Sequence, residues 1–362
     1  MSLSDVRHQD AALRRIQQAL SRDRVPHAYL FHGPEGVGTE RVARGLAQLL
    51  LCSDHTERKL SFDETSVVGL ERVREGCGRC VDCGMVSAQT HPDFHLIYRQ
   101  LHRDHPDSEV RKRKGLELGV DVLRHFVIDK VGLTPLRGRA KLFVIRAADD
   151  MTVQAQNALL KTLEEPPGST FIILLVSALD RLLPTTLSRC QLVRFDGLPE
   201  RFIRDKLHEF RRELSAERIE WCARYGEGSL GRALEFADDE LFELHQRLAE
   251  SLTRLGDGHS DALVKAWTDE ASALGERYRK RDPDITDAEA TRRGLATVFQ
   301  LAAGWYADVL RNCADTAQFM DAETFAAAIN RLAEAQRQLD LNANTQLIVE
   351  TLVGDLAGSA AV

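Results

Sequence analysis

The cysteines of this sequence have a spacing that is typical of a metal site. Cys77, Cys80 and Cys83 recur at every third position, and Cys52 lies upstream of them. Four thiolates bind zinc as a closed tetrahedron, and such a site is structural because no position is left for water. The total of seven cysteines is odd, which favours a metal site in a reducing cytoplasm over a disulfide framework. We therefore expect a structural Zn²⁺ site within a module of about residues 52–93.

The fourth ligand depends on the segment between Cys52 and Cys77. The 24 residues that separate them, 53–76, make a long gap, but the entropy of loop closure grows only slowly with length. His55 and His91 are the alternative fourth ligands, and three free thiols in a loop are the alternative to any metal site. The spacing favours four cysteines.

A glycine-rich loop follows the first apolar run of the chain. The run Ala28–His32 is typical of a buried strand, and the segment after residue 38 has the apolar spacing of a helix. The loop between them has three glycines: Gly33, Gly36 and Gly38. In this context, backbone N–H groups and the helix N-terminus bind phosphates. Hydrolysis of ATP also requires a lysine followed by Ser or Thr, but these positions are Thr39 and Glu40.

The acidic residues that an ATPase needs at the end of a later strand are also missing. There an aspartate holds the metal and a glutamate polarises water, whereas the strand Leu142–Ile145 ends in Arg146 and Ala147. Asp149 and Asp150 come about one helical turn too late. We therefore expect no ATP hydrolysis, and passive binding of a nucleotide by the glycines remains open.

The pattern of apolar residues predicts two kinds of architecture along the chain. Short apolar strands alternate with helical stretches over the first two hundred residues, which indicates a parallel sheet flanked by helices. Further strands are predicted at 94–98, 171–176 and 192–195, and helices near 120–131 and 154–163. After Pro199 almost every segment has the period of an amphipathic helix. We expect an α/β domain at 1–198, a small helical domain at 199–250 and an all-α domain at 251–362.

Two polar segments, Ser53–Gly76 and Gln100–Gly115, are predicted to be insertions. The second contains the basic run Arg111–Lys114. A solvated loop is the preferred interpretation of this run, and a contact with DNA is the alternative.

Composition restricts the function further. The chain has 362 residues and a net charge of -7, which argues against a surface whose main role is to bind nucleic-acid phosphates. Its longest apolar run, Phe171–Val176, is far shorter than a membrane span, and no secretory signal is evident at the N-terminus. We expect a cytoplasmic protein without a membrane partner.

Two long motifs carry a resemblance to a known family. The stretches Asn157–Pro167 and Leu183–Cys190 closely resemble bacterial clamp-loader subunits, and the similarity extends back through His91–Asp93 and Gly33–Gly38. This resemblance covers roughly Asp5–Phe195. It implies an AAA+ domain, a small helical lid and a helical collar that joins five subunits into a ring.

Within this family, the sequence resembles the delta-prime type. The tau/gamma motor keeps its lysine and its acidic pair, whereas delta-prime subunits commonly lose them and keep a Ser-Arg-Cys motif. Thr39, Glu40, Arg146 and Ala147 fit the second pattern. The resemblance further implies that Arg189, in the Ser-Arg-Cys motif, faces a neighbouring subunit and supplies an arginine finger in trans to its ATP.

The resemblance also implies the partners. They are the tau/gamma motor and delta subunits, with the sliding clamp and primer-template DNA contacted through the complex.

In the motor's lid an arginine lies three residues after the glycine of a Gly-Ser motif; here Gly231 occupies that position and the arginine is Arg232. The alternatives are an ATP-hydrolysing tau/gamma-like motor and a stand-alone zinc and DNA-binding module.

Overall fold

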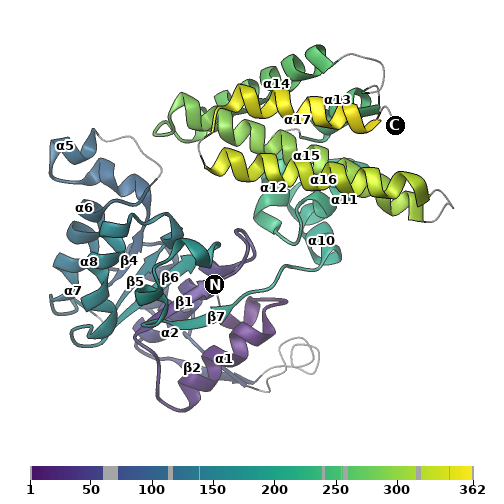
Figure 1. Ribbon diagram of the computed structural model, residues 1–362. Coiled ribbons are helices and arrows are strands. Elements are labelled where there is room, and N and C mark those ends of the chain that lie inside the picture. The colour runs from purple at the N-terminus through teal and green to yellow at the C-terminus, as the bar shows by residue number, and fades with distance from the viewer. Residues whose placement is uncertain are drawn as a thin grey trace. The chain divides into compact units, whose positions relative to one another are not determined.

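The chain forms two compact units in the computed structural model (Figure 1). One unit comprises Met1–Phe210 and Gly226–Ala233, and the other comprises Arg211–Tyr225 and Leu234–Val362. The structure describes the following residues: 2–59, 72–112, 117–137, 139–238, 241–253, 255, 260–314, 319–341 and 343–360. The predicted domain boundaries after residues 198 and 250 stay a prediction.

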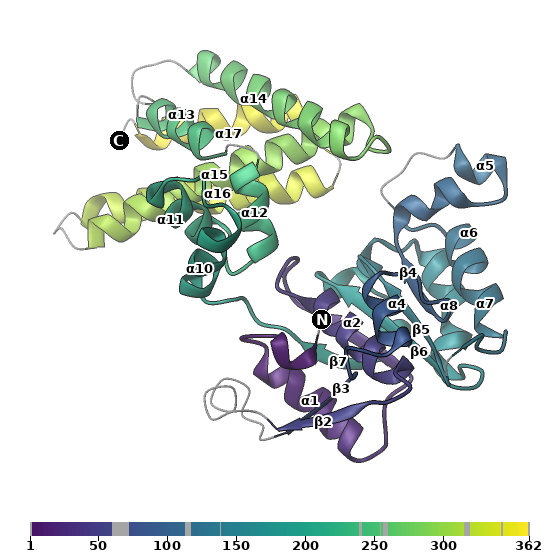
Figure 2. The same cartoon turned by 180° about the vertical axis from the view of Figure 1, so that it is seen from behind.

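A five-stranded parallel sheet forms the centre of the first unit, with the strand order β4-β5-β6-β1-β7 (Figure 2). The strands are β1 (Ala28–His32), β4 (Phe94–Ile97), β5 (Lys141–Ile145), β6 (Thr170–Val176) and β7 (Gln191–Arg194). The register aligns Leu30 with both Leu174 and Leu192. Because all strands run in the same direction, the loops after β1, β5 and β6 meet at one edge, where ligands of such sheets bind.

Both faces of the sheet are buried, as expected for parallel strands. The helices of this unit are α1 (Asp10–Ser21), α2 (Thr39–Leu51), α4 (Val81–Ser87), α5 (Ser108–Arg111), α6 (Val120–Leu123), α7 (Asp129–Val131), α8 (Val153–Glu164), α9 (Pro184–Leu187) and α10 (Glu200–Phe210). On one face, Phe143 and Ile145 of β5 pack in one cluster with Leu159 and Leu163 of α8. Helix α2 also contacts β5 and β6.

The strands and helices predicted for this unit are confirmed, with ends that agree or differ by one residue. The predicted helical stretch near 120–131 consists of α6, a π-helical segment (Arg124–Ile128) and α7. The predicted α/β class is therefore confirmed.

The two predicted insertions contain more secondary structure than their composition indicated. In the first, β2 (Thr56–Lys59) pairs antiparallel with β3 (Arg72–Glu75). In the second, helix α5 extends to Arg111, and Lys112 donates a hydrogen bond of 2.8 Å to Glu109. The remaining residues of the basic run, 113 and 114, lie outside the described part of the chain.

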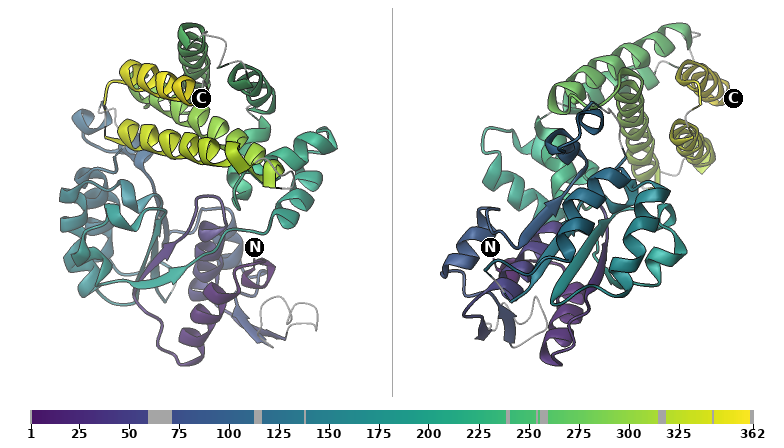
Figure 3. Two further views of the ribbon diagram at one scale, coloured as in Figure 1. Left: turned by 45° about the vertical axis from the view of Figure 1, so that its right-hand side comes forward. Right: turned by 90° about the vertical axis from the view of Figure 1, so that its left-hand side faces the viewer.

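The second unit is helical throughout its described residues (Figure 3). Its helices are α11 (Ala216–Tyr225), α13 (Leu241–Thr253), α14 (Ser260–Arg281), α15 (Asp287–Ala314), α16 (Phe319–Asp340) and α17 (Thr345–Ala360), while α12 (Leu230–Asp238) crosses from the first unit into the second. Helix α14 contacts α15 and α17, and α16 also contacts both, which makes a four-helix bundle. Gly294 allows the close approach of α15 to α14, since a Cβ there would lie 2.0 Å from the carbonyl oxygen of Ala271.

No described helix combines the length and the apolar character that crossing a membrane requires. The prediction of an all-α C-terminal part is confirmed for the residues that the structure describes.

Candidate functional site

The structure brings the four predicted cysteines into one group. Cys52 follows the end of α2, Cys80 is the N-cap of α4, and Cys83 lies in that helix. All four Sγ atoms lie within 4.8 Å of one another. The Sγ atom of Cys52 is 3.6 Å from that of Cys77 and 3.7 Å from that of Cys80. A tetrahedron with Zn–S bonds of about 2.3 Å has edges of about 3.8 Å, so the spacing of these sulfurs fits one metal ion.

Backbone N–H groups surround these sulfurs. The N–H groups of Asp54 and Cys77 each lie 3.4 Å from the Sγ atom of Cys52. The N–H of Cys80 lies 3.3 Å from the Sγ atom of Cys77, and the N–H of Cys83 lies 3.4 Å from that of Cys80. Such donors stabilise the negative charge of thiolates and orient them as ligands. The chemistry of this donor set therefore also fits a metal ion.

Neither alternative histidine belongs to the group of possible metal ligands among the described residues. His91 is buried, and its Nε2 atom lies 3.6 Å from a carboxylate oxygen of Asp82. Its Nδ1 atom accepts a hydrogen bond of 3.0 Å from the N–H of Asp93. His91 therefore contacts the loop before β4 and α4 instead of the sulfurs.

The glycine-rich loop connects β1 to α2, as its sequence predicted. Gly36 and Gly38 have φ angles of +78° and +105°, a region that favours glycine, and Gly38 is the N-cap of α2. Gly33 is required for a different reason. A Cβ at Gly33 would lie 2.6 Å from the carbonyl oxygen of Phe195. The loop therefore fits closely against the end of β7.

An ion pair joins Glu40 and Arg146, the two positions at which the sequence predicts that the magnesium ligands of an ATPase are missing. Arg146 donates hydrogen bonds to Glu40, from Nε to Oε2 at 2.6 Å and from Nη2 to Oε1 at 2.7 Å. Nε of Arg44 donates a further bond of 2.8 Å to Oε1. Burial opposes ionisation of Glu40, but the bonds and charges of Arg146 and Arg44 outweigh it and lower the pKa of the carboxyl group.

Asp149 and Asp150, which follow Arg146 in the sequence, both contact residues of the loop after β6. They lie in a 3-10 turn, Ala148–Asp150, after β5. Asp149 accepts hydrogen bonds from the N–H and the hydroxyl of Ser177, at 3.1 and 2.7 Å, and from the N–H of Ala178 at 2.8 Å. Asp150 pairs with Arg181 at 3.3 Å. These contacts hold the loop after β6.

The first turn of α12 and the residue before it pack directly on the glycine-rich loop, which the sequence did not predict. The hydroxyl of Ser229 donates a hydrogen bond of 2.5 Å to the carbonyl oxygen of Glu35, and the N–H of Gly231 donates one of 3.3 Å to that of Gly36. A Cβ at Gly36 would lie 2.7 Å from the Cα of Gly231. Arg232 pairs with Glu227 at 2.8 Å. Gly231, which replaces the expected arginine, is the sequence signal that could have indicated this contact.

Arg189 lies just after α9, and its side chain is 30% exposed. Its Nε and Nη2 atoms donate to the same carboxylate oxygen of Glu164, at 3.1 and 3.0 Å, and Nη1 donates to the carbonyl oxygen of Thr185 at 3.0 Å. Both partners belong to the motifs that carry the family resemblance. The pairing itself was not predicted.

Gln156 fixes the segment that carries Arg189, and sequence reasoning missed it. This side chain is buried in α8. Its amide nitrogen donates to the carbonyl oxygens of Met151 and Arg181, each at 3.2 Å, and its oxygen accepts a bond of 2.8 Å from the N–H of Leu183. On the other side, burial raises the pKa of the Cys190 thiol to about 12. Arg189 therefore stands on a backbone that is anchored on both sides.

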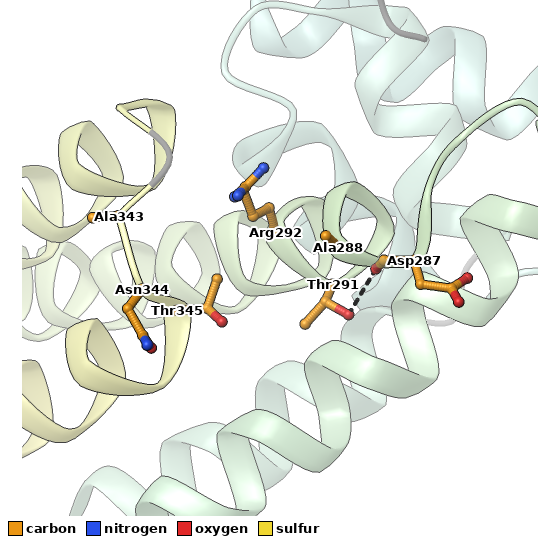
Figure 4. Close-up of a pocket in the computed structure, with 7 residues that line it drawn as sticks. All are labelled: Asp287, Ala288, Thr291, Arg292, Ala343, Asn344 and Thr345. Carbon is orange, nitrogen blue, oxygen red and sulfur yellow. Dashed lines mark hydrogen bonds between the residues drawn. The ribbon is translucent and has the colours of Figure 1, made fainter. Parts of the chain in front are cut away.

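A hollow of about 430 Å³ in the second unit contains none of the predicted site residues (Figure 4). It lies at the N-termini of α15 and α17. Its polar side chains form hydrogen bonds within α15 and at the start of α17. Thr291 donates a hydrogen bond of 3.0 Å to the carbonyl oxygen of Asp287, and Asn344 accepts one of 3.0 Å from the N–H of Gln346. These contacts are typical of helix interiors and caps.

Comparison with known families gives a match that covers all five strands of the parallel sheet. The family described as "DNA polymerase III, delta subunit" matches residues 8–199, more than half of the chain. The chain belongs to this family. The match contains the four cysteines, the glycine-rich loop itself and the Arg189 segment, whereas Ser229 and Gly231 lie outside it. The parallel sheet, its flanking helices and the helical remainder confirm the predicted α/β class with a helical C-terminal part in the described residues.

Individual members of the delta-subunit family and related proteins are similar over part of their length. The DNA polymerase III subunit delta' of Bacillus subtilis is 31% identical over 201 residues, which are 56% of this chain and 51% of that protein. The subunit tau of Escherichia coli is 30% identical over 285 residues, 76% of this chain and 39% of that protein. The chain spans about half, or less, of these curated relatives.

A crystal structure of a DNA polymerase III gamma subunit-related protein from Thermotoga maritima covers 96% of this chain and 99% of that one, at 18% identity and a TM-score of 0.42. This likeness is too distant to support an argument about function.

Proposed function

We propose that this chain is a non-catalytic subunit of the delta-prime type in a clamp loader of DNA replication. In this role it helps to load the sliding clamp on primer-template DNA, with the tau/gamma motor and delta subunits as its partners. It supplies Arg189 as an arginine finger to an ATP site of a neighbour. The membership in the DNA polymerase III delta-subunit family supports this role.

The observation that carries the proposal is the ion pair between Glu40 and Arg146. An ATPase needs a hydroxyl and an aspartate at these positions to hold magnesium on the phosphates. Here each charge is already neutralised by its partner, so Glu40 and Arg146 do not offer magnesium the ligands that it needs. Thr39 supplies no positive charge, and Ala147 cannot polarise water. The subunit is therefore expected to leave hydrolysis to its neighbours.

For the metal, we propose one structural zinc ion bound by Cys52, Cys77, Cys80 and Cys83. Zinc supplies no catalytic step in such a site, because four thiolates fill its tetrahedron. It would instead join the end of α2 to the start of α4. The helical parts after residue 199 are proposed to provide the lid (199–250) and the collar (251–362).

The experiment that tests the finger compares ring assembly with clamp-stimulated ATP turnover in the reconstituted complex. Arg189→Ala and Arg189→Lys should both assemble normally, because the side chain is partly exposed. Both should lower turnover, since lysine keeps the charge but lacks the planar fork of donors. Arginine fingers contribute on the order of 10³ to 10⁵ in rate at the site that they serve.

Arg181→Ala is the matched control, because Arg181 lies nearby and pairs with Asp150 at the surface. It should leave turnover unchanged. Normal turnover of the complex with Arg189→Ala would contradict the finger. Loss of assembly with both Arg189 variants would also contradict it, and would assign the arginine to the subunit interface.

A tau/gamma-like motor is the second candidate, favoured by the longer stretch of this chain, 76%, that matches the tau subunit. The purified subunit separates the two. We expect no magnesium-dependent ATP turnover, and Thr39→Lys alone should not create it, because Arg146 and Ala147 still leave metal and water unheld. Turnover by a preparation free of other ATPases would favour the motor.

A further inference from the structure

The guanidinium of Arg189 is held along one side by its own subunit. An arginine has five N–H donors: one on Nε and two on each terminal nitrogen. Three of them are used, by Oε2 of Glu164 twice and by the carbonyl oxygen of Thr185 once. This leaves one N–H on Nη1 and one on Nη2, and the described residues provide no further hydrogen bond to either of them.

Glu164 reaches Arg189 from a fixed position. It is the last residue of α8, and the C-terminal end of a helix carries partial negative charge that also favours a cation beside it. The same helix binds the Arg189 segment a second time through Gln156, which accepts from the N–H of Leu183. One rigid element therefore fixes both the backbone before Arg189 and the direction of its side chain.

We propose that Glu164 is the positioning residue of Arg189. By holding Nε and one N–H of Nη2, it leaves the pair of terminal nitrogens to bind two oxygens of a phosphate, the geometry in which arginine recognises phosphates. The ligand is the terminal phosphate of a nucleoside triphosphate that a neighbouring subunit binds. This proposal rests on the proposed function, and it adds a residue that touches no nucleotide.

Positioning by Glu164 has a kinetic consequence that a structural role lacks. An arginine without this support samples many rotamers, so it meets the phosphate in the productive geometry less often. Misplacement of a catalytic group lowers the rate of the chemical step. The loss should therefore appear in the rate of ATP hydrolysis within the bound complex. Binding of ADP, which lacks the terminal phosphate, should not change.

The test uses the complete reconstituted complex and measures single-turnover ATP hydrolysis, ADP binding and ring assembly. Glu164→Ala should slow hydrolysis at the served site on the order of tenfold, less than Arg189→Ala. Glu164→Gln keeps one acceptor oxygen and should recover part of the rate. Glu165→Gln is the matched control, because it neutralises the next residue, whose side chain is also exposed.

The double variant decides whether Glu164 acts through Arg189. In the Arg189→Ala background, Glu164→Ala should have no further effect. A further loss of rate in the double variant would overturn the proposal. A rate of the single variant Glu164→Ala that equals that of Glu165→Gln would also overturn it. A rate of Glu164→Ala above that of the wild type would overturn it as well, because it would show that Glu164 restrains the finger. If Arg189→Ala alone leaves hydrolysis unchanged, the proposed function fails first, and the inference with it.

Discussion

Arg146 donates two hydrogen bonds, of 2.6 and 2.7 Å, to the carboxylate of Glu40 at the carboxyl edge of the parallel sheet. Each residue occupies a position where an ATPase of this fold needs another type, and the two changes are complementary in charge. Without Arg146, Glu40 would keep Arg44 as its partner but lose two hydrogen bonds, and without Glu40 the Arg146 guanidinium would lose both of them.

Removing one member of this pair should destabilise the protein. Glu40→Gln should lower the free energy of unfolding at pH 7 by about 1 kcal/mol, since the pair is partly exposed. Arg146→Gln should have a similar effect, and the double variant should cost less than the sum. Urea unfolding of the three variants measures these differences. Additive effects would contradict a direct interaction between the two side chains.

The same pair predicts a pH dependence. The pKa of Glu40 is lower in the folded protein than its ordinary value, which is about 4.3 in an unfolded chain. Its stabilising contribution is therefore complete above that pH and is lost as the pH falls through the lower, folded value. The difference between the wild type and Glu40→Gln should shrink in this acidic range. A difference that stays constant down to the acid-unfolded state would contradict it.

The cysteine group predicts one zinc ion per chain. Cys80→Ser should release the metal and lower the stability of the segment around α4, while the sheet should stay folded because its core lies elsewhere. Elemental analysis measures the metal, and proteolysis reports on the local segment. Cys222→Ala is a suitable control, since this buried cysteine lies in the second unit.

Two outcomes would contradict the zinc prediction. Protein prepared without chelators that contains no zinc would exclude the site. If Cys52→Ser alone left zinc bound, the sulfur at the end of α2 would not be the fourth ligand, although it lies 3.6 Å from that of Cys77.

Local features of the sequence predicted most of the α/β part. Contacts between segments that are distant in the sequence were not predicted. Short apolar stretches mark the strands, and the type and spacing of the cysteines mark the metal site. The packing of Gly231 on Gly36 joins segments almost two hundred residues apart, and no periodic pattern marks it. Likewise nothing in the sequence distinguishes Gln156 from other polar residues of a helix. Its role appears only in the structure, where it contacts the segment that carries Arg189. The strands β2 and β3 were missed because their residues are polar and pair mainly with each other.

A polar network in the second unit supports a last prediction. The hydroxyl of Tyr225 donates a hydrogen bond of 2.8 Å to Asp308 and lies 2.7 Å from Nε2 of His245. Because a hydroxyl has one proton, Nε2 of His245 must be the donor in the second bond. Burial lowers the pKa of His245 to about 4, against the smaller opposing effect of Asp308.

This lowered pKa should make the protein less stable in mild acid. In the unfolded chain His245 binds a proton below about pH 6.5, whereas in the folded state it stays neutral down to about pH 4. Its contribution to stability is therefore complete above pH 6.5 and is lost as the pH falls towards the folded pKa. His245→Gln keeps an N–H donor for Tyr225 but cannot titrate, so its free energy of unfolding should fall less between pH 7 and pH 4.5.

His95 has a similarly lowered pKa in the first unit, so part of the acid sensitivity should remain. Urea unfolding across this range measures the slopes, with Tyr225→Phe as the control that keeps the histidine. Equal slopes for the wild type and His245→Gln would show that His245 is protonated in the folded protein.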